Sequence, residues 1–174
     1  VPAGPAWSLT GAWQAAPVAP SRVLGPNMPL RGSLIGHGLR FDEGIGPAPG
    51  AYAMGSETEL VRRLVREGHA CWHCPDAVVE HIIRPHQMTE AWLLLRAERF
   101  GRGQYRLAAA SAPGKPATLL GRPRWMYRAW LECALGVLAA TASRSRTRRS
   151  RARWALHELR GAMQEAGHHP PVGA

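Results

Sequence analysis

The chain has 174 residues, enough for one domain with a hydrophobic core, and 45% of them are hydrophobic, as in ordinary globular proteins. Its net charge is +10, and every basic residue except Lys115 is arginine, a composition bias that does not by itself indicate nucleic-acid binding. Three cysteines, an odd number without a secretory leader pattern, do not describe a disulfide framework and predict a reducing, cytoplasmic compartment.

The first regular element expected is a helix that begins at residue 56. Residues 1–36 are rich in Pro, Ala and Gly and predict little regular structure, and residues 37–55 have the composition of a loop. Ser56 and Glu59 have the spacing of a capping box. The apolar residues that follow fall on one helical face, and Gly68 is a natural end for the helix. These apolar residues are Leu60, Val61, Leu64 and Val65.

Two short strands and a second helix are expected next. Residues 69–74 and 77–83 predict the strands, because the second segment is rich in Val and Ile and a turn sequence separates the two. Thr89 is expected to open the helix, and Gly101 and Gly103 are expected to end it. The apolar side of this helix would consist of Trp92, Leu93, Leu95 and Phe100.

The last part of the chain predicts two more helices after a linker. Residues 112–123 are rich in Pro and Gly and read as the linker, and helical patterns follow at about 124–142 and 147–166. The longest apolar run, Ala129–Ala142, is shorter than the ~20 residues that span a bilayer and contains Glu132.

Four short segments in the first two thirds of the chain combine glycines with polar side chains. They are Gly25-Pro-Asn27-Met28-Pro-Leu-Arg31, Phe41-Asp42-Glu43-Gly-Ile-Gly46-Pro47, Gly55-Ser56-Glu57-Thr58-Glu59-Leu60 with Arg63-Leu64 and Gly68, and Pro75-Asp76-Ala-Val-Val-Glu80-His81. In this order and spacing they resemble the G-x-N-M-x-x-R, F-D-E-x-I-G, G-E-D-T-E-L and P-x-A-x-V-x-H segments of the inverting glycosyltransferases of family 2.

This resemblance implies an α/β fold, namely the C-terminal part of a glycosyltransferase-A-like fold with short strands and acceptor-side helices, followed by C-terminal amphipathic helices. Residues 1–110 would belong to the catalytic domain, 111–123 to a linker, and 124–174 to a basic helical extension. The implied activity is transfer of a hexose from a nucleotide-sugar donor to a glycan or lipid-linked acceptor with inversion, as in bacterial cell-envelope polysaccharide synthesis.

Glu57 stands at the position of the family's catalytic base. Inverting transfer needs a base that removes the proton of the acceptor hydroxyl while that oxygen attacks the anomeric carbon. In the family this base is the Asp of the E-D pair; here Glu57 replaces it, and Ser56 replaces the preceding Glu. The alternative is that Glu57 only suits the positive end of the helix dipole.

His81 matches a histidine that, in many relatives, contacts the divalent metal or the diphosphate of the leaving group. The resemblance therefore implies Mg²⁺ or Mn²⁺ as cofactor, with His81 as a metal ligand at the end of a strand. The alternative is a half-buried histidine that is hydrogen-bonded to the backbone.

Further substrate contacts are expected from arginines of the helix that begins at Thr89. Guanidinium groups bind a diphosphate well, although a solvated helix face is the alternative. The candidates are Arg96 and Arg99, followed by Arg102 and Arg106. Asp42 and Asn27 are candidates for contacts with the sugars, and for each the alternative is a structural role in its own loop.

The sequence contains no Asp-x-Asp, the metal-binding motif of the family's nucleotide-binding half, because its only aspartates are Asp42 and Asp76. It also lacks the alternating strands and helices of that half. The sequence therefore predicts a fragment whose catalytic competence alone is in doubt and whose donor sugar cannot be deduced.

A zinc module is one competing hypothesis. Cys71-Trp-His-Cys74 has metal-binding residue types, with His69 and His81 nearby. A single C-x-x-C without a second pair is a weak signal, and the two cysteines also suit a small buried strand.

A basic binding protein without catalytic activity is the other hypothesis. Its basis is the arginine cluster, defined as Arg144, Arg146, Arg148, Arg149, Arg151 and Arg153. No nucleic-acid-binding motif accompanies this cluster, so we expect no nucleic-acid partner. Apolar and aromatic residues lie beside it, which favours an anionic membrane surface on the cytoplasmic face. An amphipathic hairpin with solvated arginines is the simpler alternative.

Overall fold

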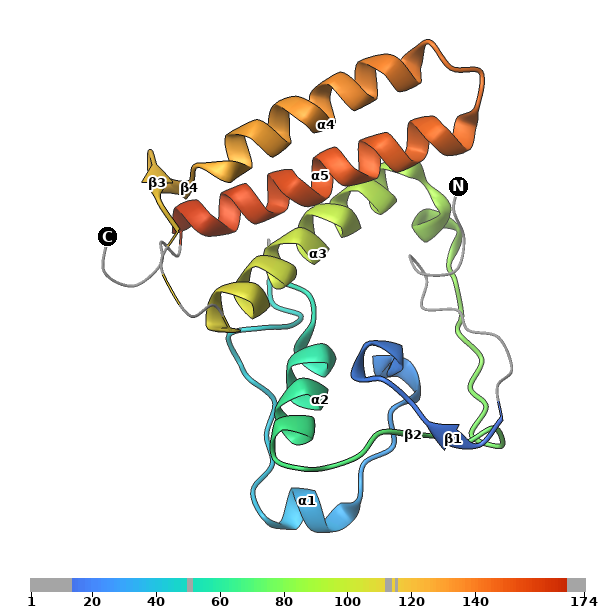
Figure 1. Ribbon diagram of the computed structural model, residues 1–174. Coiled ribbons are helices and arrows are strands. Elements are labelled where there is room, and N and C mark those ends of the chain that lie inside the picture. Colours follow the sequence, from blue (N-terminus) through green and yellow to red (C-terminus); the bar gives the residue numbers. More distant parts are fainter. Residues whose placement is uncertain (1–13, 50–51, 112–113, 115, 169–174) are drawn as a thin grey trace. The chain divides into compact units, whose positions relative to one another are not determined.

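The computed structural model describes residues 14–49, 52–111, 114 and 116–168 (Figure 1). These described residues are mostly helical (59%), with two small antiparallel sheets of two strands each. They divide into two compact units, one containing 14–46 and 55–83 and the other containing 47–49, 52–54 and 84–168. A combination of helices with short strands agrees with the expected α/β class at this coarse level.

The unit that contains residues 14–46 and 55–83 is built around one amphipathic helix. In chain order its elements are β1 (Ala16–Pro17), the 3₁₀ helices η2 (Pro20–Arg22) and η3 (Gly25–Asn27), α1 (Gly32–Gly36), α2 (Ser56–Arg66) and β2 (Trp72–His73). β1 and β2 pair antiparallel, with Ala16 opposite His73. Residues 14–36 therefore contain more regular structure than their composition predicts, and residues 1–13 lie outside the described part of the chain.

Helix α2 confirms the predicted end and three residues of the predicted apolar face, whereas Val65 is exposed. Leu60, Val61 and Leu64 are buried along it. Gly68 has a φ of +92°, which glycine adopts easily. The N–H of Gly68 bonds to the carbonyl of Val65, and the N–H of the next residue bonds to that of Leu64. This pair of hydrogen bonds is a Schellman motif, which satisfies the last carbonyls of the helix.

The predicted capping box at the start of α2 is wrong. The N-cap is Gly55, whose φ of +119° is left-handed, and Ser56 is already the first helical residue. The N–H of Glu59 bonds to the carbonyl of Gly55 rather than to the Ser56 hydroxyl. The Glu59 carboxylate instead accepts two hydrogen bonds from Arg63, at 3.0 and 3.1 Å, which raise the pKa of that arginine.

The strand predicted at residues 77–83 is also absent, and the strand predicted at 69–74 is reduced to β2. A β-branched sequence forms a strand only where a neighbouring strand supplies hydrogen bonds and a packing surface. Within the described residues no such neighbour pairs with 77–83, and Val78 and Ile82 are exposed.

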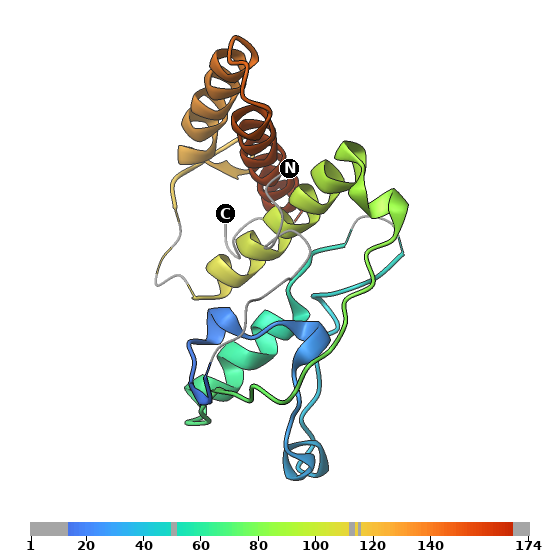
Figure 2. The ribbon, with the colours of Figure 1, turned by 90° about the vertical axis from the view of Figure 1, so that its right-hand side faces the viewer.

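The second unit is helical. Its elements are η4 (Pro85–Met88), α3 (Glu90–Ser111), β3 (Thr118–Leu119), β4 (Arg122–Pro123), α4 (Trp125–Thr141) and α5 (Arg146–His168). Thr89 opens α3 as predicted, because its hydroxyl accepts the N–H of Trp92 at 3.3 Å. The two C-terminal helices also confirm the prediction, and Figure 2 shows α4 and α5 side by side.

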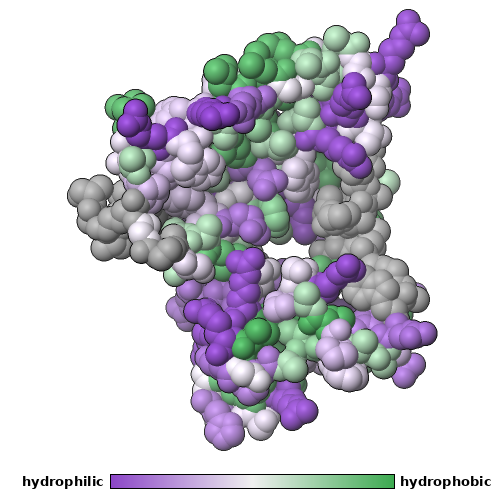
Figure 3. Space-filling model, in the orientation of Figure 1, coloured by the Kyte–Doolittle hydropathy of each residue, from purple (hydrophilic) through white to green (hydrophobic). Residues whose placement is uncertain are grey.

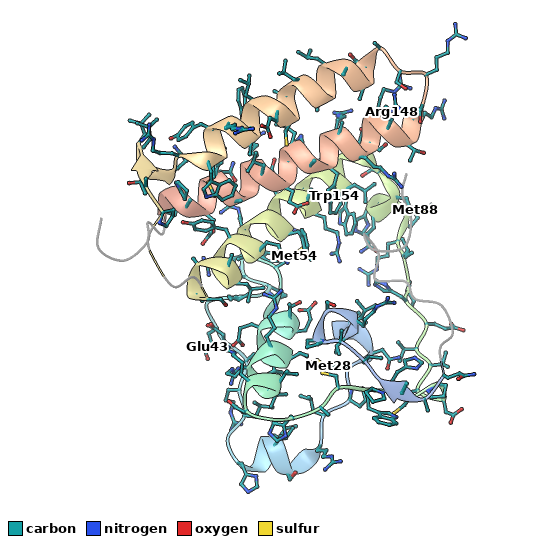
Figure 4. The ribbon with its side chains drawn as sticks, viewed as in Figure 1. Met28, Glu43, Met54, Met88, Arg148 and Trp154 are labelled. Atoms are coloured by element: carbon teal, nitrogen blue, oxygen red, sulfur yellow. The ribbon has the colours of Figure 1, made fainter. Side chains whose placement is uncertain are left out.

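Gly101 and Gly103 do not end α3 but lie inside it. A Cβ atom on Gly101 would run into the carbonyl of Glu158 in α5, and one on Gly161 of α5 would run into the carbonyl of Glu98 in α3. The two glycines therefore let α3 and α5 touch through their backbones. Gly103 likewise lets the carbonyl of Met54 approach the backbone of α3, and Met54 lies beside α3 in Figure 4.

The segment predicted as a linker contains a β-hairpin. β3 and β4 pair antiparallel, and the two residues between them, Leu120 and Gly121, have φ angles of +50° and +73°. Positive φ at both central positions is typical of a type I′ turn, which suits the twist of a hairpin. No helix among the described residues is both long and apolar enough to cross a membrane.

Candidate functional site

Glu57 lies in the first turn of α2, at the amino end of the helix, and is half-buried. The amino end is a favourable place for a carboxylate because unpaired backbone N–H groups point outward there. The hydroxyl of Ser56 donates a hydrogen bond to Oε2 of Glu57 at 3.2 Å. Ser56 therefore contacts the carboxylate directly and leaves Oε1 as the second acceptor.

The backbone of Gly25, in η3, lies against the Glu57 side chain. A Cβ atom on Gly25 would stand 3.1 Å from both Cγ and Cδ of Glu57 and 3.2 Å from Oε1. These distances are shorter than ordinary van der Waals contact, so a side chain at position 25 would displace the carboxylate. The first of the four sequence segments thus packs on the third.

The second of the four sequence segments contacts the first turn of α2 through Gly46. Its φ is +133°, and a Cβ atom there would stand 3.1 Å from Cβ of Ser56. Asp42, in the preceding turn, accepts the N–H of Gly44 at 2.8 Å. This hydrogen bond gives Asp42 the structural role in its own loop that was the alternative to a contact with the sugars.

The fourth segment is tied to the first by Asn27, whose Nδ2 donates to the carbonyl of Ala77 at 2.5 Å. Asn27 therefore has a structural contact, with a distant segment rather than within its own loop, and its contact with the sugars stays a prediction. His81 is half-buried in the irregular segment that follows Ala77 rather than at a strand end. Apart from Pro47, all four segments lie in one compact unit, joined by the contacts of Gly25, Gly46 and Asn27.

The arginines of α3 belong to the other unit, where each has a neighbour. Arg96 lies over the ring of Trp92, 5.3 Å from its centroid, and Arg99 lies 4.4 Å from the centroid of Tyr52. Arg99 also has a buried Nε for which the described residues provide no acceptor.

Arg102 and Arg106 form ion pairs with the buried carboxylate of Glu165 in α5. These ion pairs connect α3 to α5. The alternative that Arg102 and Arg106 lie on a solvated helix face is therefore wrong. Only Arg96 and Arg99 remain as candidate diphosphate contacts on this helix.

Metal ligands do not gather in the described part of the chain. A divalent cation needs several oxygen or nitrogen ligands, and among the described residues no three His, Cys, Asp or Glu side chains are grouped to provide them. The role of His81 as a metal ligand stays a prediction. The C-x-x-C pair consists of the half-buried Cys71 and the exposed Cys74, both with free thiols.

Gly25 and Gly46 had no assigned role in the sequence, although both occur in the recurrent segments. The signal that could have found them is the glycine in each of two segments that occur together with the segment that contains Glu57. A glycine is needed where another chain segment approaches the backbone closely.

No protein-family model, curated protein or solved structure significantly matches this chain.

Proposed function

We propose that this chain carries the acceptor side of the active site of an inverting glycosyltransferase, with Glu57 as the catalytic base. The observation that supports this proposal most strongly is the contact of Glu57 with Gly25. Two segments that resemble the family at separate places in the sequence meet at the one carboxylate that the chemistry requires. A helix stabilised only by an acidic residue in its first turn would not need this contact.

In the proposed reaction the acceptor hydroxyl attacks the anomeric carbon of the donor sugar, and the bond from that carbon to the diphosphate oxygen breaks. The electron pair of that bond leaves with the nucleoside diphosphate. The hydroxyl proton passes to Oε1 of Glu57, because Ser56 already occupies Oε2. The Ser56 hydrogen bond and the Gly25 backbone hold the carboxylate in one position, which matters because a small displacement of a base lowers the rate strongly.

Binding of the nucleotide-sugar donor requires groups that do not come together among the described residues. A nucleotide-sugar donor, Mg²⁺ or Mn²⁺ with the diphosphate, and a glycan or lipid-linked acceptor stay parts of the proposal. Arg96 and Arg99 stay candidates for the diphosphate on the basis of the sequence resemblance, and no position relative to Glu57 is assigned to them. Since the described residues do not group into a metal site, the proposal assigns this chain no metal-dependent step.

The proposal is tested in a protein that unites this chain with a donor-binding half. Sugar transfer is measured by mass spectrometry with a panel of uridine, guanosine and thymidine diphosphate sugars and simple glycoside acceptors. Glu57→Gln should lower kcat ~100- to 10,000-fold, the range typical of losing a general base. Glu57→Asp, which restores the side chain typical of the family, should retain activity.

The matched control is Glu59→Gln. It removes the same charge from the same turn of α2, and its amide oxygen can still accept a hydrogen bond from Arg63. Its activity should stay within a few-fold of the parent protein. Normal turnover by Glu57→Gln would show that Glu57 is not the base.

A further inference from the structure

The outer face of α4 is apolar and exposed. Leu131, Leu135 and Leu138 have exposed fractions of 55%, 55% and 65%. Their spacing of four and three residues places them in one stripe along the helix. In Figure 3 hydrophobic residues gather along α4. Trp125, at the start of the same helix, is also exposed.

The opposite face of α4 is the one that packs. Met126 and Ala140 are buried, and α4 has its main contacts with α5 and a few with β4. Within the described residues nothing covers the leucine stripe. The only ion pair described within α4 is that of Arg128 with Glu132, and the leucine stripe itself is an exposed apolar surface of the kind that marks an interaction site.

Arginines stand at the end of the same hairpin, around the α4–α5 turn, where Figure 4 labels Arg148. Arg144, Arg146, Arg148 and Arg151 are exposed, and among the described residues no carboxylate forms an ion pair with them. Arg153 differs, because it pairs with Glu90 at 2.7 Å.

These arginines do not stabilise the fold. The first turn of α5 contains basic residues and no acidic residue. Cations at the amino end of a helix are unfavourable, because that end is the positive end of the dipole. Arg146, Arg148 and Arg149, at the amino end of α5, therefore lower the stability of this helix.

We propose that the α4–α5 hairpin docks on an anionic lipid surface, with the leucine stripe in the interface and the arginines on the lipid phosphates. An anionic lipid surface satisfies both features at once, since it offers an apolar phase next to negative charge. A nucleic acid would neutralise the arginines but leave the leucines in water. A second copy of this chain would cover the leucines but bring more arginines, on a chain whose net charge is already +10. The inference does not depend on the proposed catalytic activity.

The test is co-sedimentation of the whole chain with vesicles of phosphatidylcholine alone or mixed with phosphatidylglycerol. We expect binding to the mixed vesicles at low salt, weaker binding as salt rises, and little binding to the neutral vesicles. The variant R144Q/R146Q/R148Q should lose at least about tenfold in affinity, because each arginine near an anionic surface contributes to binding. The variant L131Q/L135Q/L138Q should lose binding as well.

The matched control is R31Q/R62Q/R66Q, which removes the same net charge from exposed arginines of the other unit and should bind as the parent does. Circular dichroism of each variant confirms folding. Equal loss of binding in the two arginine variants, or equal binding to neutral vesicles, would overturn the proposal. So would a dimer in light scattering that only the leucine variant dissociates, or oligonucleotide binding in the absence of vesicle binding.

Discussion

The carboxylate of Glu57 and the backbone of Gly25 lie so close that a single methyl group would not fit between them without displacement. A Cβ atom at position 25 would stand 3.1 Å from Cδ of Glu57. Thirty-two positions separate the two residues in the sequence, and the contact is made only by the fold of the unit that contains α2.

This contact predicts an energetic coupling between the two positions. Gly25→Ala should destabilise the chain by about 1 kcal/mol through overpacking, and by clearly less in a Glu57→Ala background, where the clashing atoms are gone. Urea denaturation of the four proteins of this double-mutant cycle measures the coupling. Equal costs of Gly25→Ala in both backgrounds would show that the two residues do not touch in solution.

A second prediction concerns nucleotide binding by the isolated chain. The sequence has no Asp-x-Asp, and the described residues group no three metal-ligand side chains. Isothermal titration of residues 1–174 with uridine or guanosine diphosphate should therefore give a Kd weaker than micromolar, with or without Mn²⁺. Tight binding would mean that this chain holds the donor nucleotide by other groups.

The glycine contact between α3 and α5 predicts that a glycine-to-alanine substitution destabilises the chain inside the contact and stabilises it outside. Gly101→Ala should destabilise the chain by about 3 kcal/mol, because its Cβ atom meets the backbone of Glu158. Gly136→Ala in α4 should instead stabilise by ~0.5 to 1 kcal/mol, since nothing lies within 4 Å and alanine is the better helix former.

Thermal and urea denaturation of the two variants provide the comparison. A Gly101→Ala protein as stable as Gly136→Ala would show that α3 and α5 do not touch through these glycines.

Glu158 predicts a pH dependence of stability. Burial raises the pKa of its carboxyl, and the hydrogen bond from Trp154, 3.0 Å long, only partly opposes this effect. A raised pKa means that the folded state binds the proton more tightly than the unfolded state. The contribution of Glu158 is therefore favourable at pH values below its unfolded pKa of about 4.3 and is lost as the pH rises through the higher folded pKa.

Glu158→Gln removes this titration and keeps an acceptor for Trp154. The variant should be more stable than the parent at pH 7, and the difference should shrink toward pH 4. Urea denaturation at both pH values checks this expectation. A difference of the same size at both pH values would assign the effect to packing rather than to ionisation.

Local sequence patterns were sufficient for most of the helices. The apolar spacing of α2, the glycine at its end, the threonine that opens α3 and the two C-terminal helices depend on interactions within a few residues, and the structure has all of them. The strand expected at 77–83 is absent because a strand depends on a partner that the local sequence does not specify.

Glycine was the residue whose role the sequence could not decide. The sequence identified Gly68 as a helix end correctly and Gly101 and Gly103 as helix ends wrongly, although all three follow helical patterns. A glycine ends a helix when its φ is positive, and it continues one when another backbone approaches it. Only the packing of α3 on α5 and on Met54 distinguishes these cases.

The sequence by itself determined that a carboxylate stands at the start of a helix, that four segments occur in a recognisable order, and that arginines cluster beside apolar residues. These features are properties of neighbouring positions. The tertiary structure alone decided that Gly25 and Ser56 hold Glu57, that Arg102 and Arg106 bind Glu165, and that the leucine stripe of α4 is left uncovered. The physical reason is that contact and burial depend on distances between residues far apart in the chain, which local periodicity does not encode.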